Sequence, residues 1–544
     1  MARFNITRFL DSLSSRSIVR YIVYSCPVAF FFTLILIPPI LGIVLKWDAM
    51  GEIFGNPGLM SRATAAIYAS FAVAIFVSVI DLVAGLPMAW FIARGRSKWL
   101  NVLDSLADMP FILPTVTLGY SLLLFWSDKS QGIFSFFGES LISPGWLLVI
   151  LLHFAFSYPV VVRVMVGAIL DYQQVYEEAA RTLGAAPLTA DRTVALPILK
   201  PSLMASFILA FARSISETGA TMMVADAFEN GPIFIKSTRD KGLLGPMVFV
   251  SFILIAVSCL IFVMINLLGL RVKMPIKKVW PVAERKLSDR KIVTFRDSVT
   301  TLAFLLLILI PSLFVALPAV YAMLNGTVNE AIWQTKTIWQ EYWQSLILSY
   351  LVGVVVTLMN IIVGLPMAIL IARKRAGTLF STILDVLVNV PLIVPTIALG
   401  ASLSIFWRDV PFFPEIWLII FAHLSFTYPY FVRAMSAAVE RVNIDLEHAA
   451  RTLGARPLTV FRTVILPLTK YSLFAGAVIM FTRSVNETGA TMAVVTQLKT
   501  VPVLLVDWVE GLATPLEIGL GCGFLILLSF IILLIFRLIL RRGY

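Results

Sequence analysis

Two pairs of opposite charges lie inside long apolar stretches of this sequence, where charged side chains are costly. Arg213 precedes Glu217 by four residues, and Arg483 precedes Glu487 by the same spacing. Residues four apart share one face of a helix, so each pair can form an ion pair. An unpaired charge at a bilayer centre costs about 2.5–3.5 kcal/mol or more, and a partner or a wet path reduces that cost. Two interpretations stay open: a pair that only stabilises its helix, or groups that line or gate a path.

Small residues follow each charged pair, as Gly219-Ala220-Thr221 and Gly489-Ala490-Thr491. Small side chains let membrane helices approach one another closely. The same segment thus occurs twice in the chain, and we expect a constriction where its two copies meet. The expected residues of the translocation path or gate are Arg213, Glu217, Gly219, Thr221, Arg483, Glu487, Gly489 and Thr491.

A polar segment occurs twice between apolar stretches. Its copies are Glu177-Glu178-Ala179-Ala180-Arg181-Thr182-Leu183-Gly184 and Glu447-His448-Ala449-Ala450-Arg451-Thr452-Leu453-Gly454. The residues before each glycine favour a helix, glycine is suited to end it, and Pro187 discourages helical geometry at Ala186. The pattern predicts a helix–turn–helix elbow that docks a soluble partner, and two copies suggest a two-fold partner. The alternative is an amphipathic helix lying on the lipid.

The sequence contains no recognisable catalytic or nucleotide-binding motif. The phosphate cradle G-x-x-x-x-G-K-[ST] is absent, and no Gly-Lys pair occurs. We therefore predict no enzyme activity, catalytic residue, metal or cofactor in this chain, and expect another polypeptide to hydrolyse any ATP. His153 and His423 occupy matched positions beside apolar spans, where structural histidines are the simpler interpretation.

The composition is that of a membrane protein. The chain has 544 residues, of which 59% are hydrophobic and 14% charged, whereas soluble domains are about a quarter charged. The formal net charge is +12. Because basic residues collect in the cytoplasmic loops of membrane proteins, this charge does not indicate nucleic-acid binding.

The apolar stretches predict an all-α membrane protein with about twelve transmembrane helices in two six-helix halves. Each expected span reaches the ~20 residues needed to cross a bilayer. The ranges are 21–46, 64–93, 104–126, 146–170, 202–226 and 244–271, then 297–324, 346–373, 380–407, 414–438, 471–496 and 515–540. The expected domains are residues 1–271, a basic cytoplasmic linker at 272–296, and residues 297–544.

The two halves repeat beyond the elbows, in the same order. Gly85-Leu86-Pro87-Met88-Ala89 matches Gly364-Leu365-Pro366-Met367-Ala368, and Pro110 and Pro114 match Pro391 and Pro395. An even number of spans separates the copies, which predicts parallel repeats about an axis along the membrane normal. Lys and Arg concentrate in alternate connections, which places both termini and both elbows in the cytoplasm. The connection at 227–243, with Lys236, Arg239 and Lys241, is an exception.

The elbow resembles the signature loop of permease subunits of binding-protein-dependent ABC importers. The resemblance rests on Glu178-Ala179-Ala180, Gly184, Val194, Leu196 and Pro197, and on Ala449, Ala450, Gly454, Val464, Leu466 and Pro467. It covers nearly the whole chain, as two fused permease halves. It implies a cell-membrane permease of the type I importer architecture, with two copies of an ATPase subunit and an extracytoplasmic solute-binding protein as partners.

The resemblance also implies the ATPase-docking residues. They are Glu177, Glu178, Ala179, Ala180 and Gly184 in one half, and Glu447, His448, Ala449, Ala450 and Gly454 in the other. His448 stands at the Glu178 position, which predicts unequal docking sites.

The expected substrate is a small oxyanion. The Glu-Thr-Gly-Ala-Thr segments resemble a stretch of molybdate, tungstate and sulfate permeases, whereas fusion of two halves in one chain resembles ferric-ion and thiamin permeases. Both remain candidates at this point. A secondary transporter is the alternative of another class, but it leaves the paired elbows unexplained.

Overall fold

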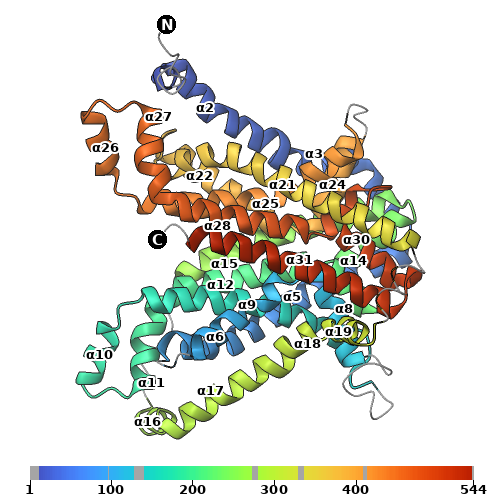
Figure 1. The fold of residues 1–544 in the computed structure, drawn as a ribbon, viewed down its shortest axis with the longest axis horizontal. Helices are drawn as coiled ribbons and strands as arrows, with labels where there is room; N and C mark the ends of the chain where they lie inside the picture. The colour runs from blue at the N-terminus through green and yellow to red at the C-terminus, as the bar shows by residue number, and fades with distance from the viewer. Residues whose placement is uncertain are drawn as a thin grey trace.

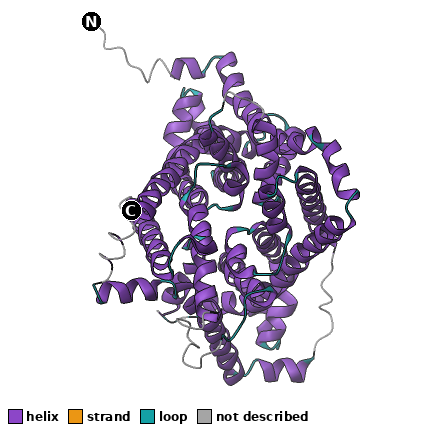
Figure 2. Cartoon of the chain, turned by 90° about the vertical axis from the view of Figure 1, so that its right-hand side faces the viewer, coloured by secondary structure: helices purple, strands orange, loops and turns teal. Residues whose placement is uncertain are grey.

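The computed structural model describes residues 11–95, 97, 99–127, 140–271, 280–326, 328, 332, 336–408 and 413–541. In these residues the secondary structure is helical throughout, as Figure 2 shows in a view onto one end of the bundle. Helices suit an apolar solvent because each satisfies its own backbone hydrogen bonds. The all-α prediction is confirmed.

Ten helices in the described part of the chain are long and apolar enough to cross a membrane, and one bent pair is an eleventh candidate. The first half contains α2 (Ser17–Phe30), α3 (Ile37–Leu45), α5 (Pro57–Arg94), α9 (Trp146–Asp171), α12 (Leu196–Ser216) and α15 (Leu244–Arg271). The second half contains α17 (Arg290–Phe304), α18 (Ile310–Leu313), α21 (Lys336–Ala372), α25 (Glu415–Arg441), α28 (Leu466–Val485) and α31 (Pro515–Arg541).

The third expected span of each half is broken, contrary to the single helices predicted at 104–126 and 380–407. The first consists of α6 (Trp99–Ala107), α7 (Met109–Ile112) and α8 (Thr115–Ser127). The second consists of α22 (Thr378–Val388), α23 (Val390–Ile393) and α24 (Thr396–Arg408), and it bends by 102°. Leu113 and Val394 are extended because Pro114 and Pro395 follow them.

The two halves run in the same direction through the bundle. Figure 1 shows α10 (Val175–Thr182), α11 (Pro187–Ala190), α26 (Ile444–Thr452) and α27 (Pro457–Val460) together at one end, which we call the elbow end. The opposite end carries α14 (Gly231–Asp240), α19 (Ala316–Leu324) and α30 (Val501–Asp507). This arrangement agrees with parallel repeats.

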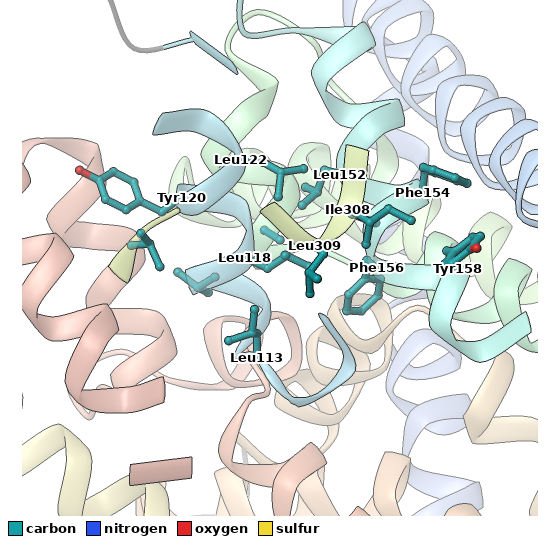
Figure 3. Packing of buried hydrophobic residues seen from close by; sticks show 14 of the residues in the cluster. Leu113, Leu118, Tyr120, Leu122, Leu152, Phe154, Phe156, Tyr158, Ile308 and Leu309 are labelled. Carbon is teal, nitrogen blue, oxygen red and sulfur yellow. The ribbon is translucent and has the colours of Figure 1, made fainter. Parts of the chain in front are cut away.

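The first spanning helix of each half packs on the other half. In Figure 3, Ile308 and Leu309 of the second half lie among Leu118, Leu122 and Leu152 of the first. Reciprocally, Phe31 stacks on Tyr428, as Phe304 stacks on Tyr158. The halves are therefore interlocked by their starting helices.

Proline bends in these starting helices receive matched hydrogen bonds from the opposite half. The Ser121 hydroxyl of α8 donates to the Pro311 carbonyl at 2.6 Å. The Val315 N–H in turn donates to the Ser121 hydroxyl. In the other half, Ser402 of α24 donates to the Pro39 carbonyl. Ser121 thus stands between the Pro311 carbonyl and the Val315 N–H, and its hydroxyl replaces the helical hydrogen bond that these two groups would otherwise make.

Candidate functional site

Each elbow consists of two short helices that a glycine turn separates. Helix α10 ends before Gly184, whose φ is +93°, and α26 ends before Gly454, whose φ is +85°. This left-handed conformation costs glycine little, so both glycines end their helices as predicted. The chain then enters α11 or α27, passes through a π-helical turn, η4 (Asp191–Ala195) or η6 (Phe461–Ile465), and continues into α12 or α28.

The repeated glutamates of the elbows face inward. Glu177 pairs with Arg94 at the end of α5, with 2.9 Å between oxygen and nitrogen. Glu447 makes the equivalent pair with Arg373 at the end of α21, at 2.8 Å, and is nearly fully buried. Both glutamates were expected on the docking surface. Their positions instead give them the role of anchoring the elbow to a spanning helix.

The outer face of each elbow carries small residues and one leucine. Glu178, Ala179 and Gly184 are exposed in the first elbow, and Ala180 is half-buried. His448, Ala449 and Gly454 are exposed in the second, and Ala450 is half-buried. The leucines before the two glycines, Leu183 and Leu453, are 89% and 88% exposed.

These leucines were missed from the sequence, although they repeat in both copies. Val175 and Tyr176 of the first elbow and Ile444 and Leu446 of the second are exposed as well, so each elbow gathers several exposed apolar side chains, as surfaces that another protein covers do. Among the exposed residues named above, the two elbows differ at one position, where the first has Glu178 and the second has His448. The predicted difference between the two docking sites therefore lies on their outer faces.

The charged pairs lie at helix breaks, whereas the sequence placed them inside continuous spans at 202–226 and 471–496. Helix α12 ends at Ser216 and is followed by α13 (Gly219–Ala225), while α28 ends at Val485 and is followed by α29 (Gly489–Val494). Glu217 accepts from the Ala220 N–H at 2.9 Å, and Glu487 accepts from the Ala490 N–H at 3.1 Å. Each glutamate therefore caps the short helix that follows it.

The arginines of the two pairs have different neighbours. Arg483 and Glu487 form the expected ion pair at 3.2 Å. The Arg213 guanidinium lies over the Phe156 ring, 3.8 Å from its centroid, and its Nε donates to the Phe156 carbonyl. Both pairs directly precede segments that touch across the halves, because Gly219 lies against Thr488 and Gly489 lies against Thr218. The structure thus brings the four predicted charges into one central cluster.

A buried histidine ties the helix break together in each half. His153 places its two ring nitrogens 2.8 Å from Ser214 Oγ and 2.9 Å from Thr221 Oγ1. His423 has the same relationship to Ser484 and Thr491, at 2.8 Å each. Because both ring nitrogens have hydroxyl partners, these residues fit the structural interpretation that the sequence favoured.

The two halves meet at reciprocal glycine–threonine contacts. A Cβ atom on Gly219 would come within 2.6 Å of the Thr488 side chain, and one on Gly489 would come within 2.7 Å of Thr218 Oγ1. Only glycine permits this approach. The two segments therefore approach as closely as their small residues allow, and the contact includes Thr218 and Thr488, which were not among the predicted residues. That this contact is a constriction on a path stays a prediction.

Two buried polar atoms at this contact have no hydrogen-bond partner in the described residues: Thr218 Oγ1 and Thr488 Oγ1. Leaving such a group unsatisfied costs about 1–3 kcal/mol. A buried hydroxyl without a partner therefore lies on each side of the contact between the halves. Across the described residues, no cluster of three or more His, Cys, Asp or Glu side chains fits a metal ion.

Two of the three basic residues that broke the charge pattern at 227–243 have internal partners. Arg239 of α14 donates to the carbonyls of Met492 and Val495, at the end of α29. Lys236 pairs with Glu510 at 2.7 Å. These charges act within the protein, so they weigh less in an orientation argument.

Comparison with known proteins identifies two copies of one domain. The sequence profile of a family described as "binding-protein-dependent transport system inner membrane component" matches residues 85–274 and again 361–543. The sulfate transport system permease protein CysT of Salmonella typhimurium is 32% identical over 226 residues, which cover 39% of this chain and 78% of that protein. The molybdenum transport system permease protein ModB of Escherichia coli K12 is 33% identical over 164 residues, covering 29% and 69%.

Proposed function

The chain belongs to the family of inner membrane components of binding-protein-dependent transport systems, and from this premise we propose that it is the fused permease of an ATP-driven importer of a small oxyanion. A separate ATPase binds its two elbows, and a solute-binding protein delivers the substrate to the opposite end. The chain supplies both halves of one pathway, because the domain occurs twice and the halves interlock.

The observation that carries this proposal is the pair of elbows at one end of the bundle (Figure 1). Each presents an exposed leucine and small residues outward, and each is anchored inward by a glutamate–arginine pair. An elbow that is anchored to a spanning helix and presents an exposed leucine among small and charged residues can bind a soluble subunit and transmit its displacement. The basic residues of the expected cytoplasmic connections support placing the elbows and both termini in the cytoplasm.

The central cluster is the proposed gate. Alternating access requires a barrier that opens toward one side at a time, and the Gly219–Thr488 and Gly489–Thr218 contacts join the two halves directly. Separating the elbows would pull α12 and α28 apart and open these contacts. Arg213 and Arg483 would then offer positive charge to an anion in the opened path.

Sulfate, molybdate and tungstate are the proposed substrates. The support is the pair of relatives whose printed names are sulfate and molybdenum permeases, together with Arg213 and Arg483, two half-buried arginines at the helix breaks. The unpartnered threonine hydroxyls suit an oxyanion, which accepts hydrogen bonds.

The test is reconstitution of the chain with its ATPase and binding protein in liposomes. We expect co-purification with two ATPase copies, and ATP hydrolysis that the loaded binding protein stimulates. Labelled sulfate, molybdate, tungstate, ferric ion and thiamin are compared as substrates. Uptake driven by an ion gradient without ATP would instead establish a secondary transporter, and uptake of ferric ion or thiamin would overturn the oxyanion assignment.

A further inference from the structure

A short segment before each starting helix contacts the elbow of the opposite half. Helix α16 (Pro281–Leu287) precedes α17 of the second half and lies against α11 of the first elbow, as Figure 1 shows. Residues 11–14 are helical, precede α2 of the first half, and contact α27 of the second elbow. We call these the second-half strut (280–289) and the first-half strut (11–16).

The second-half strut makes a buried polar contact with the first elbow. Glu284 is 3% exposed, accepts a hydrogen bond from Thr189, and pairs with Arg192 at 2.6 Å. The Leu188 N–H donates to Ser288 Oγ at 3.1 Å, so the strut also caps the start of α11. The hydrogen bond from Thr189, with smaller contributions from the Trp280 N–H and Arg192, holds the pKa of Glu284 below its usual range despite burial. The carboxylate is therefore ionised at neutral pH.

The first-half strut repeats this capping on the second elbow. The Leu458 N–H donates to Ser14 Oγ at 3.3 Å, and the Thr459 N–H donates to Asp11 Oδ1 at 3.0 Å. Ser14 thus meets Leu458 as Ser288 meets Leu188. The sequences agree: residues 13–19 read LSSRSIV and residues 287–293 read LSDRKIV, with five of seven positions identical. The strut is therefore part of the internal repeat. The sequence analysis had treated residues 272–296 as a linker between the halves and had not included them in the repeat.

We propose that each strut fixes the elbow of the opposite half to the starting helix that follows it, with Glu284 as the positioning residue of the first elbow. The inference rests on the proposed function for its consequence, which concerns coupling. Because each starting helix packs on the opposite half, strut, elbow and starting helix form one mechanical unit. Each elbow is thus joined to two membrane helices, which for the first elbow are α12 and α17. A displacement of the elbow then moves both helices together.

The first test compares Glu284→Gln with Asp289→Asn in the full chain. Asp289 is an exposed strut residue five positions away, so the control makes the same change of charge outside the contact. We expect Glu284→Gln to accelerate amide hydrogen exchange in residues 187–193 at least fivefold, with no change in 457–463 and no change in the control. This measurement needs no ATPase, so it judges the contact even where the proposed function fails. Equal exchange in the two variants would overturn the strut, and Ser288→Ala provides a milder second variant.

The second test asks whether strut and elbow move as one unit during transport. The double variant Leu188→Cys with Ser288→Cys places two cysteines on either side of the contact. A short bifunctional thiol reagent then cross-links these cysteines in the assembled transporter. We expect ATP-driven uptake to survive the cross-link, and transport per ATP to fall at least fivefold in Glu284→Gln but not in Asp289→Asn. Uptake abolished by the cross-link would show that the elbow leaves the strut, and would overturn the proposal. If the unmodified transporter shows no ATP-driven uptake, the proposed function fails, and the hydrogen-exchange result alone decides the strut.

Discussion

Gly219 of the first half lies against Thr488 of the second so closely that a Cβ atom on the glycine would come within 2.6 Å of the threonine side chain. The mirror contact joins Gly489 and Thr218. These contacts sit at the breaks between α12 and α13 and between α28 and α29, beside the central charges. The two halves therefore touch through backbone and hydroxyl groups at the place where a gate is proposed.

A methyl group at this contact should hold the halves apart. We expect Gly219→Ala to lower the free energy of unfolding by about 1–3 kcal/mol, because overpacking forces neighbours to shift. We also expect passive flux of sulfate or molybdate through liposomes without ATP. Gly167→Ala is the matched control, since this helical glycine of α9 has no atom within 4 Å of the added methyl position. A tight, fully stable Gly219→Ala variant would contradict the gate.

The unpartnered threonine hydroxyls should disfavour the closed state. Replacing Thr218 and Thr488 with valine keeps the shape and removes both hydroxyls, so we expect each substitution to raise the free energy of unfolding by about 1–3 kcal/mol. Uptake should slow, because opening would no longer hydrate these groups. Thermal unfolding and initial uptake rates measure both effects.

For comparison, Thr221→Val should change the free energy of unfolding in the opposite direction. Its hydroxyl lies 2.9 Å from His153 and donates to the Glu217 carbonyl, so its removal should destabilise the protein. Destabilisation by the Thr218 and Thr488 substitutions as well would mean that these hydroxyls do have partners in the closed state.

Sequence reasoning recovered the features that short local patterns encode. Gly184 and Pro187 define the first elbow, and the matched residues of the second half reveal the repeat. The break after Ser216 was missed because no proline marks it, and because Glu217 looks like the partner of Arg213 when the helix is assumed to continue. Its carboxylate also caps α13. Glu487 caps α29 in the same way while it pairs with Arg483, so the i, i+4 ion pair does not require a continuous helix.

Contacts between distant segments were beyond the sequence. Nothing local to Pro311 indicates that Ser121 hydrogen-bonds its carbonyl, and nothing near Glu284 indicates Arg192. The inward orientation of Glu447 also depends on its partner Arg373, which directly follows the end of α21 and is distant in the sequence. A helical pattern gives the relative angles of side chains, but it does not say which face meets the rest of the protein.

The buried anchor of the second elbow should be essential for coupling. Breaking a buried ion pair costs about 3–5 kcal/mol because one charge is left without its partner. We expect Glu447→Gln to reduce transport per ATP hydrolysed by tenfold or more. Glu177→Gln should have a smaller effect, because the Glu177–Arg94 pair is more exposed than the Glu447–Arg373 pair. Uptake and hydrolysis are measured in the same liposomes, and an effect of equal size in both variants would refute the ranking.

The exposed leucines should be required for ATPase binding. We expect Leu183→Asp together with Leu453→Asp to weaken co-purification of the ATPase at least tenfold, since burying a charge at an apolar contact is costly. The melting temperature of the isolated permease should stay unchanged, because both side chains are almost fully exposed. Leu324→Asp is the control, because this leucine of α19 is 80% exposed and α19 lies at the opposite end of the bundle. Normal ATPase binding by the double variant would remove these leucines from the docking surface.

Asp81 of α5 offers a test of whether every buried charge in the bundle serves transport. It is fully buried, one carboxylate oxygen accepts from Ser157, and Oδ1 has no hydrogen-bond partner in the described residues. In the matched position of the second half, Asn360 donates to Thr427 at 2.8 Å. Asp81→Asn should reproduce that pair in the first half.

We therefore expect Asp81→Asn to keep wild-type uptake and to leave the melting temperature equal or higher, because burying a carboxylate is costlier than burying an amide. Asp81→Leu should lower the melting temperature, because leucine is bulkier than aspartate at a fully buried site; Ser157 keeps the His153 carbonyl as an acceptor at 2.6 Å. Uptake rates at saturating substrate and thermal unfolding of both variants check the argument. A loss of uptake in a stably folded Asp81→Asn protein would instead make this carboxylate part of the transport pathway, and would extend the functional charges beyond the central cluster.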